Sequence, residues 1–231
     1  MIFRVGIENN NEGIRSIAWA LEHPGCFAYG KDADEALANL PASVRAYADW
    51  IGEHEPAWFE AQQIELIVED RFEAYFINTA YDRVKASEDE INAWFQYDWK
   101  PLTAEDIEGG LKLLSLTRQD LLNTVKGLSA AKFEQTYPNE KWNINGILNH
   151  VGAGERWYMD RLGLAFPRSE LPQEPMARLE KVRAHLIHLL PTLQDSKQVV
   201  GADGEFWSPR KMLRRAVWHE KDHTIHIRKL L

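Results

Sequence analysis

Two histidines four positions apart, His219 and His223, are the residues whose type and spacing most clearly predict chemistry. On a helix, side chains at i and i+4 lie one above the other on the same face, so both imidazoles can reach one metal ion. His226 lies about 10 Å from His219 along a helix, whereas zinc–nitrogen bonds are about 2.0–2.1 Å. His226 therefore cannot bind the same ion as His219 and His223, and we expect a third ligand from another segment. The best candidate is His150.

Three neutral imidazoles would leave positions on the ion open, which is typical of catalytic rather than structural sites. Histidine binds several divalent ions, so the choice of metal stays open, and zinc and nickel are the two that we expect first. Water or a thiolate at an open position would be deprotonated near neutral pH. Glu220, which follows His219, is the candidate catalytic proton acceptor. The alternative is a surface carboxylate paired with Lys221 or Arg215.

Other residues near these histidines admit two interpretations each. Glu155, about one turn beyond His150, could orient a ligand histidine or be a charge on the surface. Arg214 and Arg215 could hold an anionic substrate or thiol, or form a solvated basic patch. The string from His219 to His223 also fits H-E-x-x-H, but it has only three fixed positions and no third ligand follows it, so we do not expect a zinc protease.

Four helical patterns in residues 101–231 would position these side chains. Each begins at a recognisable signal: Thr103 as a cap, Asn143 as a cap, a start near Glu174, and Ser208 followed by a proline at the first helical position. The expected ranges are 103–127, 143–163, 174–194 and 208–230. Four helices of this length, separated by loops, predict an up-down four-helix bundle.

Two stretches of this bundle carry a family resemblance. The run Trp142-Asn-Ile-Asn-Gly-Ile-Leu-Asn-His150 and the run Trp218-His219-x-x-x-His223-x-x-His226 resemble the DinB-like metalloprotein superfamily of bacteria. That resemblance implies a metal site at His150, His219 and His223. It also implies reactions such as thiol-dependent S-transfer, with a low-molecular-weight thiol as a further cofactor.

The first hundred residues predict a different fold. Strand patterns at 2–8, 14–20, 26–29 and 63–69 surround a helix over 33–53 that Asp32 or Asp34 can cap. The run from Pro24-Gly25-Cys26 through Glu35-Ala36 to Leu40 resembles the HicB-like antitoxin domain. No DNA-binding segment follows it, so the alternative is a unit kept for scaffolding or dimerisation. The aromatic-rich residues 71–100 are interpreted as an interdomain segment.

Charge supports this division. Residues 1–100 hold 8 Lys and Arg against 19 Asp and Glu, whereas residues 101–231 hold 19 against 16. A first half with a net charge of −11 argues against nucleic-acid binding, which depends on positive charge. No apolar run is long enough to span a membrane, and one cysteine, Cys26, fits the cytoplasm. We therefore expect an α+β protein with a HicB-like α/β domain at 1–100 and a DinB-like bundle at 101–231.

Two classes of function remain open. The first is a metal-dependent enzyme acting on a small molecule, either a thiol S-transferase or a metal-assisted hydrolase. The second is a non-catalytic binding protein, in which the HicB-like unit engages a partner and the bundle serves as a scaffold. A homodimer is compatible with either function.

Overall fold

The computed structural model describes residues 1–53, 63–85 and 89–231, and the chain divides into two compact units. The first comprises Met1–Lys100 together with Val199–Trp207, and the second comprises Pro101–Gln198 together with Ser208–Leu231. Residues 199–207, predicted as part of the bundle, group with the first unit. Independent folding of the two parts remains a prediction. Within the described residues, no helix is both long and apolar enough to cross a bilayer.

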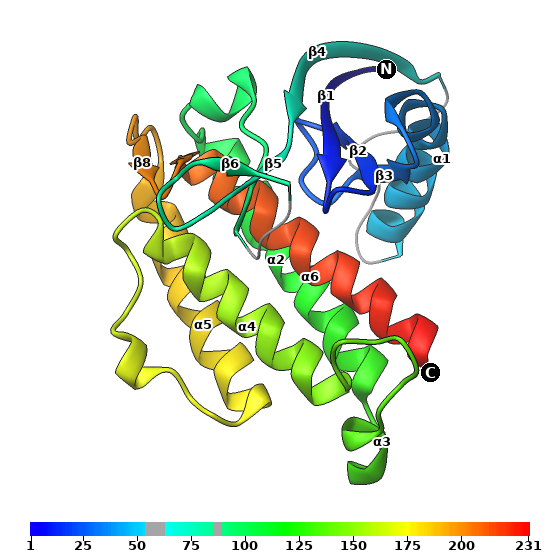
Figure 1. The fold of residues 1–231 in the computed structure, drawn as a ribbon, viewed down its shortest axis with the longest axis vertical. Coiled ribbons are helices and arrows are strands. Elements are labelled where there is room, and N and C mark those ends of the chain that lie inside the picture. The colour runs from blue at the N-terminus through cyan, green and yellow to red at the C-terminus, as the bar shows by residue number, and fades with distance from the viewer. Residues whose placement is uncertain (54–62, 86–88) are drawn as a thin grey trace. The chain divides into compact units, whose positions relative to one another are not determined.

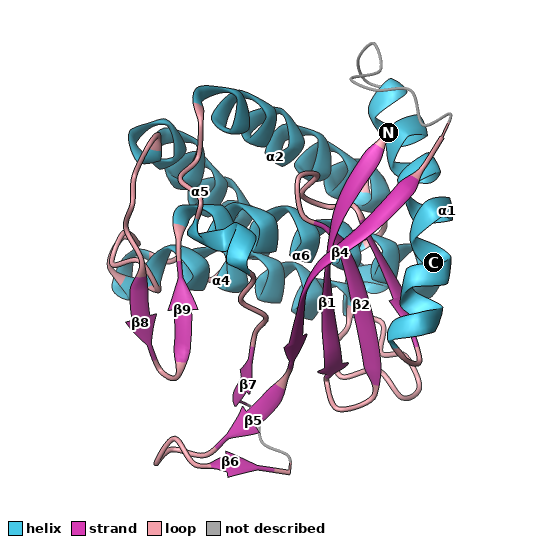
Figure 2. Ribbon diagram, turned by 90° about the horizontal axis from the view of Figure 1, so that it is seen from above, coloured by secondary structure: helices cyan, strands magenta, loops and turns pink. Residues whose placement is uncertain are grey.

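A four-stranded sheet with one helix against it forms the main part of the first unit (Figure 2). The strands are β1 (Ile2–Asn11), β2 (Arg15–Ala20), β3 (Phe27–Gly30) and β4 (Glu65–Glu73), in the order β3-β2-β1-β4. β4 runs parallel to β1, and the other pairs are antiparallel. Helix α1 (Ala33–Gly52) begins at Asp32, whose carboxylate accepts a hydrogen bond from the backbone N–H of Glu35. The strand and helix order agrees with the sequence, while the HicB-like resemblance remains a prediction.

The aromatic-rich segment is not the linker that the sequence predicted. It contains β5 (Tyr75–Ile77), β6 (Arg83–Val84) and β7 (Asp89–Ile91), which form a three-stranded sheet, and the 3-10 helix η1 (Gln96–Trp99). Residues 86–88 of the predicted segment lie outside the described residues. The side chain of Phe95, one of these aromatic residues, is fully buried. The segment is therefore part of the first unit.

A hairpin far along the chain completes the first unit. Strands β8 (Val200–Ala202) and β9 (Glu205–Trp207) pair through a two-residue turn, Asp203-Gly204, in which both residues have positive φ. The carboxylate of Glu205 accepts hydrogen bonds from the backbone and side-chain nitrogens of Asn92 at 2.7 and 2.6 Å. Trp207 is fully buried. The hairpin thereby belongs to the fold of residues 1–100, although it lies between two bundle helices in the sequence.

Four long helices build the second unit and lie side by side (Figure 1). They are α2 (Ala104–Val125), α4 (Ile144–Asp160), α5 (Pro175–Leu189) and α6 (Pro209–Leu230). The predicted caps Thr103, Asn143 and Ser208 each accept a hydrogen bond from the backbone N–H three residues on. Shorter elements connect the helices: α3 (Ala130–Glu134), η2 (Arg168–Glu170) and η3 (Leu190–Leu193).

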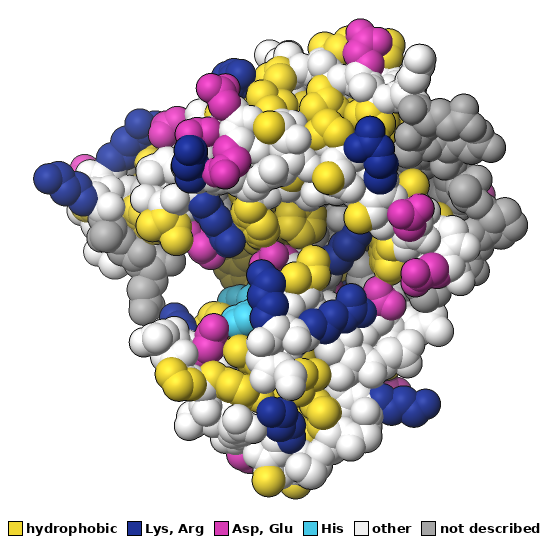
Figure 3. Space-filling model, turned by 90° about the vertical axis from the view of Figure 1, so that its right-hand side faces the viewer, with side chains coloured by type: hydrophobic (Ala, Val, Ile, Leu, Met, Phe, Trp, Pro, Cys, Tyr) yellow, Lys and Arg dark blue, Asp and Glu magenta, His cyan; other side chains and the backbone are white. Residues whose placement is uncertain are grey.

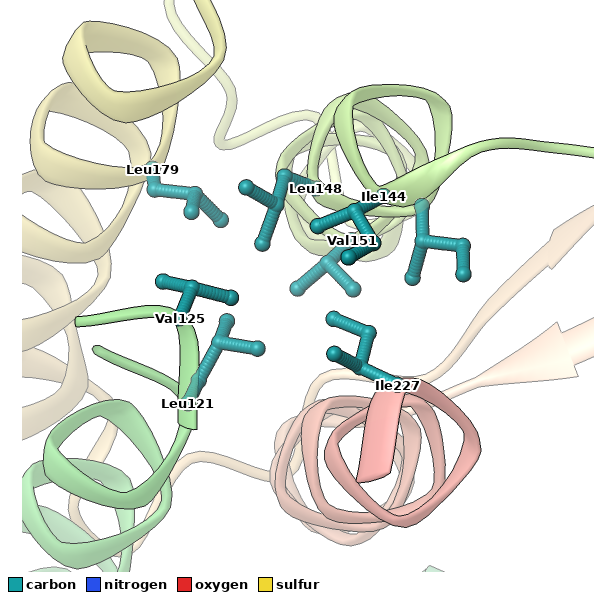
Figure 4. Close-up of a cluster of buried hydrophobic side chains, with 8 residues drawn as sticks. Leu121, Val125, Ile144, Leu148, Val151, Leu179 and Ile227 are labelled. Atoms are coloured by element: carbon teal, nitrogen blue, oxygen red, sulfur yellow. The ribbon is translucent and has the colours of Figure 1, made fainter. Parts of the chain in front are cut away.

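All four helices contribute to a buried apolar cluster (Figure 4). α2 supplies Leu121 and Val125, and α6 supplies Ile227. The remaining members come from α4 and α5: Ile144, Ile147, Leu148, Val151 and Leu179. Burying apolar side chains of this size stabilises a fold by about 1.5–3 kcal/mol each. The cluster holds α4 against α6, and these are the two helices that carry the predicted ligands.

Candidate metal centre

His150, His219 and His223 converge in the structure, and each directs its Nε2 atom toward the others. The Nε2 atom of His219 lies 3.0 Å from that of His150 and 3.1 Å from that of His223. Among the described residues, this is the one group of three His, Cys, Asp or Glu side chains whose donor atoms lie within 4.8 Å of one another. The residues that the sequence singled out as ligands therefore meet at one point.

Two helix starts fix where these rings lie. The side-chain oxygen of Asn143 accepts a hydrogen bond from the N–H of Gly146 at 2.8 Å, which starts α4 two turns before His150. Trp142, just before the cap, stacks on the ring of His150 with centroids 4.4 Å apart. Ser208 and its following proline start α6, where His219 and His223 lie one turn apart.

Burial keeps the three imidazoles neutral. It lowers the pKa of His219 well below its usual value, and the neighbouring rings and Arg215 lower it further. Burial, followed by His150 and His226, lowers the pKa of His223 to about 3. For His150 the causes of a lowered pKa are burial and the ammonium of Lys141. Neutral imidazole is the form that binds metal, because its lone pair is available.

Two of the three histidines are partly accessible to solvent. His219 is buried, whereas His150 and His223 are only half-buried. Histidine side chains reach the molecular surface on the face drawn in Figure 3. An ion held by the three Nε2 atoms would therefore have room for ligands from solvent.

His226 does not take part in this group, as its distance from His219 along the helix predicted. Its Nε2 atom lies 2.9 Å from a carboxylate oxygen of Glu140. His185 likewise lies elsewhere, with its Nε2 atom 2.8 Å from the carbonyl oxygen of Leu164.

Residues 113–227 match the family model of the DinB superfamily. The helical bundle is DinB-like. The match begins within α2, ends within α6 and includes all three histidines of the centre.

Two further proteins are similar to parts of this chain. A protein of Oceanobacillus iheyensis with the name "Putative metal-dependent hydrolase OB0413" is 26% identical over 150 residues, which are 55% of this chain and 86% of the relative. The solved structure of YfiT from Bacillus subtilis, described as "a probable metal-dependent hydrolase with an unusual four-helix bundle topology", has 19% sequence identity and a TM-score of 0.47. That similarity covers 61% of this chain and 91% of YfiT.

Glu220, the candidate proton acceptor, has a different environment in the DinB-like bundle from either one expected. It is not a surface carboxylate, because its side chain is 1% exposed. One carboxylate oxygen accepts from Nε of Arg118 at 2.5 Å, and the other accepts from Arg183 and Thr117, each at 2.6 Å. Burial raises the pKa of Glu220, but the two guanidinium groups outweigh it and hold the pKa below its usual value. A carboxylate engaged in this way is a poor proton acceptor.

Glu155 belongs to the same buried group and does not orient a ligand histidine. Both of its oxygens accept from Arg183 at 2.8 Å, and one lies 3.3 Å from Nη2 of Arg118. The interpretation as a surface charge is also wrong, because the residue is 2% exposed. Thr117, Arg118, Glu155, Arg183 and Glu220, here called the charge network, join α2, α4, α5 and α6.

Arg214 and Arg215 lie in α6, the helix that carries His219 and His223. The guanidinium carbon of Arg215 lies 4.1 Å from the ring centroid of Trp218, and both side chains are buried. Arg214 is also buried, so the interpretation of both arginines as a solvated basic patch is wrong. Sequence reasoning missed Arg118 and Arg183, since nothing in a helical pattern distinguishes a buried arginine from an exposed one.

Proposed function

We propose that this protein is a metal-dependent hydrolase of the DinB-like type, with one divalent ion, zinc or nickel, held by His150, His219 and His223. The convergence of three Nε2 atoms at separations of 3.0 and 3.1 Å carries the proposal. The name of the Oceanobacillus relative supports the metal-dependent and hydrolytic parts of it.

The donor set fits such an ion. Two nitrogens bound to a tetrahedral zinc ion at about 2.0–2.1 Å lie about 3.3–3.4 Å apart, which is close to the separations between the Nε2 atoms here. Imidazole is a donor that suits both zinc and nickel. With three protein ligands, at least one position stays available for water or substrate, as in catalytic zinc sites.

A divalent ion bound here would acidify a coordinated water and polarise a carbonyl or phosphoryl oxygen of the substrate. The protein's part is to hold neutral imidazoles in place. The stacked Trp142 fixes the plane of the His150 ring. Tyr158 lies 5.8 Å from the His219 ring, at right angles to it. Because Glu220 is engaged in the charge network, we assign it the role of anchoring α6 rather than of accepting a proton.

An S-transferase that binds a thiolate at the same centre is the second candidate function. The observation that favours it is the positive surroundings of the histidines. The ammonium of Lys141 lies 5.0 Å from the ring centroid of Trp142, which stacks on His150. The guanidinium of Arg215 lies over Trp218, whose ring is 5.9 Å from that of His219. Such surroundings attract an anionic ligand such as a thiolate.

Elemental analysis of protein purified without a histidine tag tests the proposed centre. We expect about one divalent ion per chain in the wild type, and less than a tenth of that occupancy in His150→Ala, His219→Ala and His223→Ala after dialysis. His226→Ala is the matched control, because it lies on the same helix as two ligands and should keep full occupancy. Full occupancy in any one of the three ligand variants would remove that residue from the centre.

The Co²⁺ form of the protein separates the two reactions. A thiol that binds cobalt adds a sulfur-to-metal charge-transfer band, so such a band with cysteine or glutathione favours the S-transferase. A spectrum that responds to acetate or azide but to no thiol favours the hydrolase. A Co²⁺ spectrum that responds to none of them contradicts both, because it means that the ion has no open position.

A further inference from the structure

Gly154 lies directly against the ring of His219. A Cβ atom built on Gly154 would lie 2.7 Å from Cε1, 3.2 Å from Nδ1 and 3.5 Å from Nε2 of that ring. Non-bonded carbon atoms pack at about 3.5–4.0 Å. A side chain at position 154 and the present position of the His219 ring are therefore incompatible.

The position of Gly154 on α4 relates it to the other ligand. His150, Gly154 and Tyr158 follow one another at intervals of four residues, so they lie in one row on the same face of the helix. The ring of His219 lies 4.8 Å from the ring of His150 and 5.8 Å from that of Tyr158. Between these two rings, the missing side chain of Gly154 leaves the slot that the His219 imidazole fills.

Local backbone conformation does not explain a glycine here. Gly154 lies inside α4 and is not among the glycines with positive φ. In a helix interior, glycine is less favourable than any other residue except proline, because it has the most conformational freedom to lose. A close approach of the His219 ring is the feature of the structure that requires it.

We propose that Gly154 is a positioning residue for the metal ligand His219. This inference rests on the proposed metal centre. A methyl group at position 154 pushes the His219 ring away from α4, and thus away from the point where its Nε2 atom meets those of His150 and His223. The substitution directly changes the geometry of the three donor atoms. It replaces no residue of the apolar cluster or of the charge network.

Metal affinity of the full-length Gly154→Ala variant is the first measurement, by competition with a chromophoric chelator for Zn²⁺ and by the absorption spectrum of the Co²⁺ form. Mutations that disturb the orientation of metal ligands typically cost about 10- to 100-fold in affinity. We expect a loss in this range and a changed Co²⁺ spectrum.

Gly152→Ala is the matched control on the same helix. Its added methyl would lie 2.8 Å from Cγ of Arg178, a flexible side chain on α5 and not a ligand. We expect affinity within about twofold of the wild type. Equal affinity of the Gly154→Ala and Gly152→Ala variants would overturn the inference. A wild type that binds no metal would instead overturn the proposed function.

A second measurement tests the contact without any metal. Melting temperatures are compared in the presence of a chelator for the wild type, Gly154→Ala, His219→Ala and the double variant. We expect Gly154→Ala to lower Tm when His219 is present and to raise it in the His219→Ala background, where the clash is gone and alanine favours the helix. If Gly154→Ala alone does not fold, folding of the double variant shows the same clash. A change of the same sign and size in both backgrounds would overturn the inference.

Discussion

His23 lies in the first unit beside the rings of Phe3 and Tyr47, with centroid distances of 5.1 and 6.2 Å, and burial lowers the pKa of its imidazole to about 4. An unfolded chain binds this proton at a pKa of about 6.5. Between pH 4 and 6.5 the unfolded state therefore holds more protons than the folded one, so stability falls as the pH is lowered through this range. Above about pH 6.5 both states are neutral and the effect is absent.

We expect the His23→Gln variant to lose less stability on acidification than the wild type. The pKa of His23 is about 2.5 lower in the folded state than in the unfolded state. At pH 4 this difference lowers the free energy of unfolding of the wild type by about 3 kcal/mol. Urea unfolding at pH 7 and pH 4, with a chelator present, measures this difference. The metal-site histidines are the same in both proteins, so their contribution cancels. Two stability curves that stay parallel over this range would contradict the expected role of His23.

The residues of the candidate site differ in how well their roles could be predicted from the sequence. The ligand pair on α6 follows from spacing, because i and i+4 share a helix face whatever the rest of the fold. Its partner His150 could be named as the best candidate, but only the family resemblance supported that choice, since no local rule relates two helices that are distant in sequence. Gly154 has a signal, a glycine inside a well-capped helix, but only the position of the His219 ring explains it.

At the scale of helices, the charge network is the feature that connects all four members of the bundle. Arg183 donates to both Glu155 and Glu220, and these two carboxylates raise its pKa although burial opposes this. Buried ion pairs seldom stabilise a fold more than apolar packing does, but the removal of one partner leaves a costly unpaired charge. The network therefore specifies how α6 lies against α2, α4 and α5.

We expect Glu220→Gln to destabilise the protein by about 3–5 kcal/mol, because it leaves a buried guanidinium without its counter-charge. A second substitution, Arg118→Gln, restores the balance of charge. The double variant should then be less destabilised than the sum of the two single variants. Urea unfolding of the four proteins measures this coupling. Strict additivity would mean that the two side chains act independently, in conflict with their 2.5 Å hydrogen bond.

Elements with strong local signals could be predicted, and elements that depend on tertiary contacts could not. The caps Thr103, Asn143 and Ser208 gave the starts of three bundle helices correctly. The hairpin of β8 and β9 was missed although Asp203-Gly204 is a typical turn of a two-residue hairpin. Its strands have three residues each, too few for an alternating pattern to stand out.

At the scale of the whole molecule, the chain leaves the bundle after Gln198 and returns to it at Ser208. Val200 and Trp207 are paired across the hairpin, so its two ends lie close together. Adjacent strands are about 4.7–4.9 Å apart, a distance that a short linker can span.

We therefore expect a fragment of residues 101–231, in which Gly-Ser-Gly replaces residues 199–207, to be soluble and helical. The same fragment with the hairpin retained should aggregate, because it exposes Trp207, which is fully buried in the intact chain, without its partners. Circular dichroism and gel filtration of both fragments measure the difference. An unfolded fragment with the linker would show that the bundle depends on the first unit.

The discontinuous first unit also has a consequence for biosynthesis. A ribosome delivers the chain from the N-terminus, and domains usually fold in that order as they emerge. Here the first unit lacks its hairpin until residue 207 has been made, by which time α2, α4 and α5 are already present. The first unit can therefore be completed only after three of the four bundle helices have been synthesised.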